Sequence, residues 1–145
     1  MVYGILFRAV SETIKELMQD SRYPGTEVGF IATLHTWSQT LMDHPHIHRI
    51  VIEGGLSRDG KRWVLCKGKF FLPVKVLSRL FRGKFLACLK EAYEKGKFIF
   101  PGRIASLKEK ETFKVLLKDL YAHEWVVSCK SPFRSAETVV DYLGR

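Results

Sequence analysis

Two neighbouring stretches of the sequence, Phe30-Ile31-Ala32-Thr33-Leu34-His35-Thr36-Trp37 and Asp43-His44-Pro45-His46-Ile47-His48-Arg49-Ile50-Val51-Ile52-Glu53, decide the fold. Both are rich in β-branched and aromatic residues and are typical of β-strands. Side chains alternate between the two faces of a strand, so His46 and His48 project from the same face, with α-carbons roughly 7 Å apart. His35 stands eleven residues before His46. We therefore expect the two strands to be adjacent and these three histidines to converge.

Converging imidazoles are typical of a metal site. The alternative for each histidine is a hydrogen-bonded structural role, which is the commoner one for a single histidine among apolar neighbours. Here the strand that carries His46 and His48 is apolar enough on both faces to lie inside a sheet, where a pair of histidines needs a reason. The pattern favours a divalent metal held by His46 and His48.

Composition limits the class of protein. The chain has 145 residues, 46% of them hydrophobic and 12% aromatic, which fits one domain with its own core. Lys and Arg number 24 against 15 Asp and Glu, giving a net charge of +9. This balance favours a polyanionic partner, nucleic acid first, with a solvated basic surface as the alternative.

Cysteines and apolar runs exclude several classes. The 3 cysteines are widely separated and form no Cys-x-x-Cys pair, so neither a disulfide framework nor a cysteine zinc site is indicated. The N-terminus lacks the features of a signal peptide, and no apolar stretch approaches the roughly 20 residues of a membrane span. We expect a cytoplasmic protein with no membrane partner.

The remaining pattern predicts an α+β domain. Besides the two strands above, the expected elements are helices at about 3–20, from Pro73 to Gly96, from a capping box at 106–109 through Leu120, and from Ser135 onward, and strands at 61–66 and 125–129. Short connections among the first three strands imply a central antiparallel sheet with helices packed on it.

One face of the helix that follows Pro73 is basic. Lys75, Arg79 and Arg82 lie close together on that face at helical spacing, as a surface that follows a phosphate backbone would require. An ordinary solvated helix face is the alternative. We take these three residues as candidate DNA-binding residues.

Five motifs in order resemble a known family. They are Leu34-His35-Thr36-Trp37-Ser38-Gln39-Thr40-Leu41, His44-Pro45-His46-Ile47-His48, Gly54-Gly55-Leu56-Ser57, Phe71-Leu72-Pro73-Val74-Lys75-Val76-Leu77-Ser78-Arg79-Leu80-Phe81-Arg82-Gly83 and Tyr142-Leu143-Gly144-Arg145. Together they closely resemble the two-tyrosine HUH transposases of rolling-circle bacterial insertion sequences, over nearly the whole chain. The resemblance implies an HUH-endonuclease-like fold and an enzyme that cuts one DNA strand and rejoins it.

The resemblance also implies roles for named residues. His46 and His48 match the histidines that hold a divalent metal, and Tyr142 matches the first tyrosine, which attacks the phosphorus and leaves a 5′-phosphotyrosine. Magnesium or manganese is the expected metal, and zinc or nickel could be carried over from purification. The partner is single-stranded DNA at the element's ends, and no nucleotide cofactor is expected.

The third metal ligand is left open by the sequence. In the related conjugative relaxases a histidine precedes the HUH pair at the spacing that separates His35 from His46, so His35 is our first choice. Gln39, Glu137 and Asp141 are the alternatives, since in single-tyrosine relatives the third ligand lies on the tyrosine helix.

We expect three departures from the family pattern. The second tyrosine would fall at position 146, and we expect it and the family's cysteine-rich, zinc-binding N-terminal segment to be absent. Arg49 replaces a cysteine usual in relatives and is expected to add a positive charge beside the site, as a candidate DNA-binding residue. We therefore expect one HUH transposase catalytic core over residues 1–145. It is either a nicking and strand-transfer enzyme or a catalytically impaired DNA-binding remnant of one.

Overall fold

The computed structural model describes residues 1–37, 43–66, 72–130, 133 and 136–143, and the chain forms two compact units. The first unit comprises Met1–Ile14 and Pro73–Ser128, and the second comprises Lys15–Leu72 and Cys129–Arg145. Each unit is thus built from two separate stretches of the chain. The catalytic core predicted for residues 1–145 would span both.

Helices build the first unit. Its elements are the N-terminal part of α1 (Val2–Gln19), α2 (Val74–Glu94), the 3-10 helix η1 (Gly102–Lys108) and α3 (Lys110–Ala122). Helix α2 begins directly after Pro73, whose fixed φ suits a helix start, and Gly96 follows its end with a φ of 63°. The sequence prediction for α1 and α2 is therefore confirmed.

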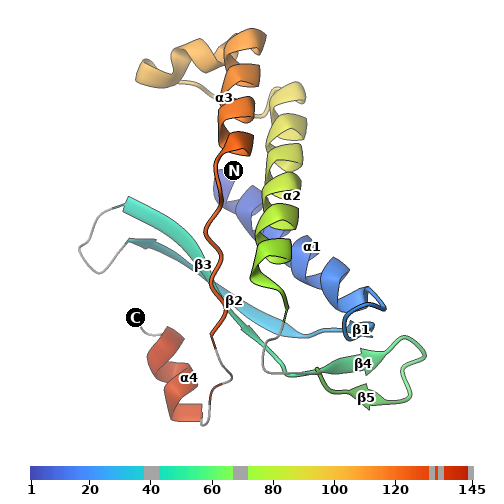
Figure 1. Cartoon of the computed structure of the whole chain (residues 1–145). Helices are drawn as coiled ribbons and strands as arrows, with labels where there is room; N and C mark the ends of the chain where they lie inside the picture. Colours follow the sequence, from blue (N-terminus) through green and yellow to red (C-terminus); the bar gives the residue numbers. More distant parts are fainter. Residues whose placement is uncertain (38–42, 67–71, 131–132, 134–135, 144–145) are drawn as a thin grey trace. The chain divides into compact units, whose positions relative to one another are not determined.

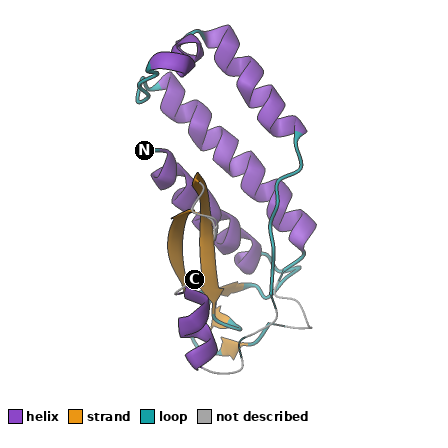
Figure 2. Cartoon of the chain, turned by 90° about the vertical axis from the view of Figure 1, so that its left-hand side faces the viewer, coloured by secondary structure: helices purple, strands orange, loops and turns teal. Residues whose placement is uncertain are grey.

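Aromatic and aliphatic side chains form the core of the first unit. Cys88, Leu89 and Ala92 of α2 are buried against Phe113 of α3, and the two helices lie side by side (Figure 2). The Tyr93 ring stacks on Phe113 with centroids 3.9 Å apart, and its hydroxyl donates a 2.7 Å hydrogen bond to the carbonyl of Lys108. This packing fixes α3 on α2.

The capping box predicted at residues 106–109 does not form. Helix α3 begins at Lys110, and its N-cap residue, Glu109, makes no side-chain capping hydrogen bond. The reason is that Ser106 belongs to η1, where its carbonyl accepts a hydrogen bond from the Glu109 amide. The 3-10 turn therefore uses the Glu109 N–H, which the Ser106 hydroxyl would bind in a capping box.

The strand predicted at residues 125–129 is also absent, and this segment is a loop. Side chains of α2 bind its backbone: the Ser78 hydroxyl donates to the carbonyl of Trp125, and Arg82 donates to the carbonyl of His123. The Trp125 indole N–H donates in turn to the carbonyl of Leu120. Side chains thus satisfy polar groups that a neighbouring strand would otherwise pair.

The second unit holds all the described strands. They are β1 (Thr26–Glu27), β2 (Phe30–Trp37), β3 (Asp43–Val51), β4 (Gly55–Ser57) and β5 (Trp63–Val64), followed by α4 (Ala136–Leu143). Strands β2 and β3 pair antiparallel (Figure 1), as the sequence predicted. Strands β1, β4 and β5 form a second antiparallel sheet in the order β1-β4-β5. The α+β class is confirmed.

Gly54 and Gly55 lie where the chain passes from β3 in one sheet to β4 in the other. Glu27 pairs with Leu56 and Phe30 pairs with Val51, so residues 28–29 face residues 52–55 on the neighbouring strand. Gly54 has a φ of +129°, which side chains rarely adopt. A β-carbon at Gly55 would overlap the carbonyl oxygen of Glu27 and the side chain of Thr26. Only glycine therefore fits at Gly55.

The strand predicted at 61–66 is shorter in the structure. It is β5, Trp63–Val64, and it pairs with β4.

Gly55→Ala is expected to lower the free energy of unfolding by about 1–3 kcal/mol, because the new methyl group meets backbone that cannot rotate away. Urea unfolding measures the change. Gly83→Ala is the matched control, since nothing lies within 4 Å of its β-carbon position in α2. There alanine should raise the free energy of unfolding by about 0.5–1 kcal/mol. Equal effects of both substitutions would contradict the steric argument.

Trp63 of β5 does not belong to the core of this unit. Its side chain is 54% exposed, whereas the buried side chains of the unit include Met18, Thr26 and Leu72. No described helix combines the length and the apolarity that crossing a membrane requires. The predicted cap at Ser135 lies outside the described residues.

Candidate metal centre

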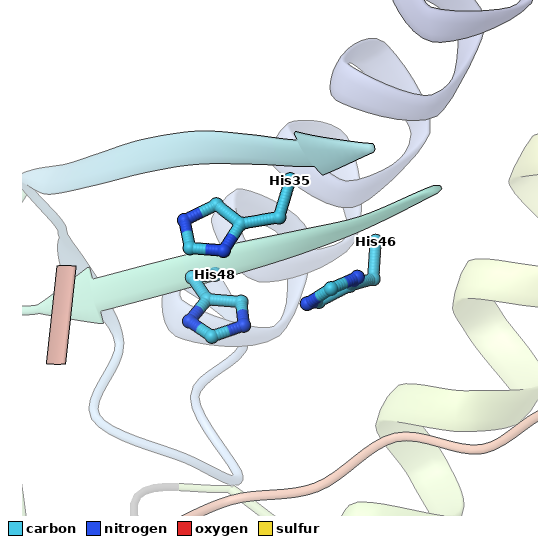
Figure 3. A group of neighbouring side chains, drawn as sticks. All are labelled: His35, His46 and His48. Carbon is cyan, nitrogen blue, oxygen red and sulfur yellow. The ribbon is translucent and has the colours of Figure 1, made fainter. Parts of the chain in front are cut away.

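The β2–β3 ribbon brings three histidines together on one face. His35 of β2 lies directly opposite His46 of β3, and Thr33 lies opposite His48. Directly opposed residues of an antiparallel pair point to the same face, and alternation puts His48 on the face of His46. Figure 3 shows the three rings gathered on the same side of the ribbon.

The three imidazoles are close enough to share an ion. Ring centroids are 4.3 Å apart for His35 and His48, 4.8 Å for His46 and His48, and 5.4 Å for His35 and His46. One nitrogen from each lies within 4.8 Å of the others. Two nitrogens bound to one ion at about 2.1 Å are at most about 4.2 Å apart. Side-chain rotations that move the nitrogens by about 1 Å would therefore let all three bind one ion.

Two features of His48 fit a metal ligand. Its Nδ1 is buried and has no hydrogen-bond partner in the part of the chain that the structure describes. The pKa of His48 is lowered by burial first, and then by the neighbouring His35, His46 and Lys130. The imidazole is therefore held in its neutral form, which is the form that binds a metal.

The low pKa of His48 makes stability depend on pH. The unfolded state, with a pKa of about 6.5, takes up the proton first as pH falls. The free energy of unfolding of the metal-free protein should therefore decrease below about pH 6.5. Urea unfolding at pH 7.5 and 5.5 measures this, and His48→Asn should lose part of the decrease. An identical decrease in the variant would show that other groups cause it.

Tyr142 of α4 lies against this cluster. Its ring centroid is 4.7 Å from that of His48, with 30° between the rings, and 5.1 Å from that of Phe133. The ammonium nitrogen of Lys130 is 5.4 Å from the Tyr142 ring centroid. Burial raises the pKa of the phenol. At neutral pH the hydroxyl is protonated, so loss of its proton needs help from nearby positive charge.

The alternatives for a third ligand are placed differently. His35 belongs to the cluster, whereas Glu137 is an exposed residue of α4. Gln39 lies outside the described residues, and the side chain of Asp141 does too. The geometry favours His35, and its role as a ligand stays a prediction.

Arg49 lies on the other face of the ribbon. It is opposite Ala32, one residue along from His48, and its guanidinium lies over the Phe30 ring at 4.2 Å from the centroid. Burial lowers the pKa of the guanidinium to about 10, so it remains charged at neutral pH. Arg49 therefore does not add its charge to the histidine face as expected, and its part in DNA binding stays a prediction.

The three basic residues of α2 differ in their surroundings. Lys75 and Arg79 are exposed. Arg82 donates a 2.8 Å hydrogen bond to the carbonyl of His123 and stacks on the Tyr121 ring at 4.6 Å. Arg82 thus holds the end of α3 against α2. Contact of all three with DNA stays a prediction.

Lys130 and Phe133 were missed by the sequence interpretation. Both stand beside Tyr142, in the segment that leads into α4. Residues 125–129 had been assigned to a strand, so nothing in the spacing linked Lys130 to Tyr142. An aromatic and a cationic residue shortly before a helix are common in any sequence, so the sequence alone does not single them out.

Comparisons with known proteins identify the family of the chain. A family model described as "Putative transposase", which represents the two-tyrosine rolling-circle transposases, matches residues 29–145. The chain is 50% identical over its whole length to "Putative transposase y4qJ" of Sinorhizobium fredii (strain NBRC 101917 / NGR234), and it spans 36% of the length of that relative. No solved structure matches it significantly. The chain belongs to the two-tyrosine rolling-circle transposase family.

Proposed function

We propose that this chain carries the catalytic core of a transposase that nicks single-stranded DNA and transfers the cut strand through a 5′-phosphotyrosine. The observation that carries the proposal is the position of the Tyr142 ring, 4.7 Å from the ring of His48 within the three-imidazole cluster. A potential nucleophile beside a set of metal ligands is the arrangement that phosphoryl transfer by this route requires.

His35, His46 and His48 would hold a divalent cation. When bound, that ion supplies Lewis-acid chemistry at the scissile phosphate. Imidazole nitrogens suit zinc and nickel as ligands, whereas magnesium and manganese prefer oxygen. The resemblance to the HUH transposases nevertheless implies manganese or magnesium in function. The preference of imidazole for zinc and nickel means that the isolated protein could carry over one of these metals from purification.

Tyr142 would be the nucleophile. Its phenolic oxygen attacks the phosphorus and loses its proton to solvent, and the bond between phosphorus and the 3′ oxygen breaks. The 3′ oxygen takes up a proton and leaves as a hydroxyl, while the 5′ phosphate stays on the tyrosine. The phosphotyrosine conserves the energy of the broken bond, so the DNA 3′ hydroxyl of a new partner can reverse the step without a nucleotide cofactor.

The charge of the chain suits a DNA substrate. The net charge of +9 favours binding to a polyanion, and Lys75 and Arg79 are exposed on α2. These two residues also support the second candidate function, a DNA-binding remnant that no longer cuts. The chemistry at Tyr142 distinguishes the two.

The test is the intact mass of the chain after incubation with manganese and a pool of single-stranded oligonucleotides. An adduct with the mass of a 3′-side DNA fragment, together with release of the 5′-side fragment ending in a 3′ hydroxyl, would support the nicking enzyme. EDTA in a parallel sample should prevent both. Metal and DNA binding without any adduct would support the remnant instead, and absence of DNA binding would contradict both.

A further inference from the structure

Lys130, in the segment that precedes α4, places a positive charge beside the tyrosine and the histidines. The ammonium nitrogen of Lys130 is 5.4 Å from the Tyr142 ring centroid. The Tyr142 ring lies in turn 4.7 Å from the ring of His48, which places Lys130 near the histidine cluster as well. Lys130 therefore lies close to both groups that the proposed reaction uses.

No carboxylate balances this charge in the described part of the chain. The ion pairs found there join other residues, and Lys130 has none. The imidazoles of His35, His46 and His48 carry no negative charge either, and a divalent cation bound to them would add positive charge. Cations gathered at one place repel each other unless an anion enters between them.

The Tyr142 ring is what holds Lys130 in this place. An ammonium group is attracted to the face of an aromatic ring, and the ring itself is fixed between His48 and Phe133, with centroid distances of 4.7 and 5.1 Å. Lys130 remains exposed, so its ammonium can be reached from solvent. The arrangement offers a positive charge to a ligand that approaches the phenol and the imidazoles.

We infer that Lys130 is a phosphate-binding residue of this site, whose ammonium binds a non-bridging oxygen of the DNA phosphodiester presented to Tyr142. The inference rests on the proposed function for the identity of the ligand. Lysine binds a phosphate as a point charge, and one such contact at the reacting group both positions the phosphorus and stabilises charge that grows during attack.

Binding of a single phosphodiester tests the inference without any chemistry. The probe is the thymidine dinucleotide TpT, added with manganese to a Tyr142→Phe protein, in which the ring that holds Lys130 is kept but no adduct can form. Calorimetry is expected to show that Lys130→Gln in this background weakens TpT about tenfold, whereas Lys130→Arg, which keeps the charge, changes the affinity less than about threefold. The dependence of log affinity on log salt should fall by about 0.7 in Lys130→Gln.

Lys61→Gln is the matched control, because Lys61 is an exposed lysine of the same unit in the β4–β5 turn. It should leave TpT affinity unchanged. The Tyr142→Phe protein is compared with its Lys130→Gln and Lys61→Gln derivatives. Equal TpT affinities of all three would overturn the inference, even if the protein that retains Tyr142 forms the DNA adduct. Conversely, a loss of TpT affinity in the Lys130→Gln protein alone would support the inference, even if the protein that retains Tyr142 forms no adduct. In that case only the proposed nicking activity would fail.

Discussion

Tyr142→Phe is expected to reduce formation of the covalent DNA adduct by at least about a thousandfold, because the substitution removes the attacking oxygen and nothing else. The contacts of Tyr142 with His48, Phe133 and Lys130 all involve its ring, and phenylalanine keeps that ring. The histidine cluster and the path of α4 should therefore be unchanged. Intact mass spectrometry with manganese and single-stranded oligonucleotides measures the adduct.

Tyr121→Phe provides the matched control. Tyr121 is a 60% exposed tyrosine of the first unit, whose ring contacts Arg82, and it has no proposed part in the reaction. Its variant should form the adduct at the wild-type rate. If Tyr142→Phe formed the adduct as fast as wild type, the nucleophile would be another residue, and matching Tyr142 to the family's first tyrosine would be wrong.

Much of the site could be predicted because strands have a simple period. Alternation placed His46 and His48 on one face, and spacing between two strands made His35 their neighbour, as the register of β2 and β3 shows. The same alternation places Arg49 on the opposite face, yet the sequence interpretation put its charge beside the site. The expected position of this charge is therefore wrong.

Other features could not be predicted because they depend on contacts distant in sequence. The segment around Trp125 has the apolar and β-branched residues of a strand, but side chains of α2 bind backbone carbonyls there instead. A pair of glycines such as Gly54 and Gly55 is typical of a loop, and only the pairing of β4 with β1 shows that this pair lies between two sheets. Lys130 gains its position from the Tyr142 ring, twelve residues later in the chain. Local pattern carries no information about such partners.

His46→Ala and His48→Ala are expected to weaken manganese binding by at least about a hundredfold each, because each would remove one of the few proposed protein ligands. Calorimetric titration measures the affinity. Both side chains are only partly buried, so the free energy of unfolding of the metal-free protein should change by less than about 1 kcal/mol.

Two comparisons make this test specific. His123→Ala removes a histidine of the first unit that hydrogen-bonds the carbonyl of Asp119, and it should leave manganese affinity unchanged. His35→Ala should weaken manganese at least about tenfold if His35 is the third ligand. Unchanged affinity in His35→Ala would instead assign the third ligand to Gln39 or to α4. Unfolding of both His46→Ala and His48→Ala would mean that the histidines hold the ribbon together, and a structural role would then replace the catalytic one.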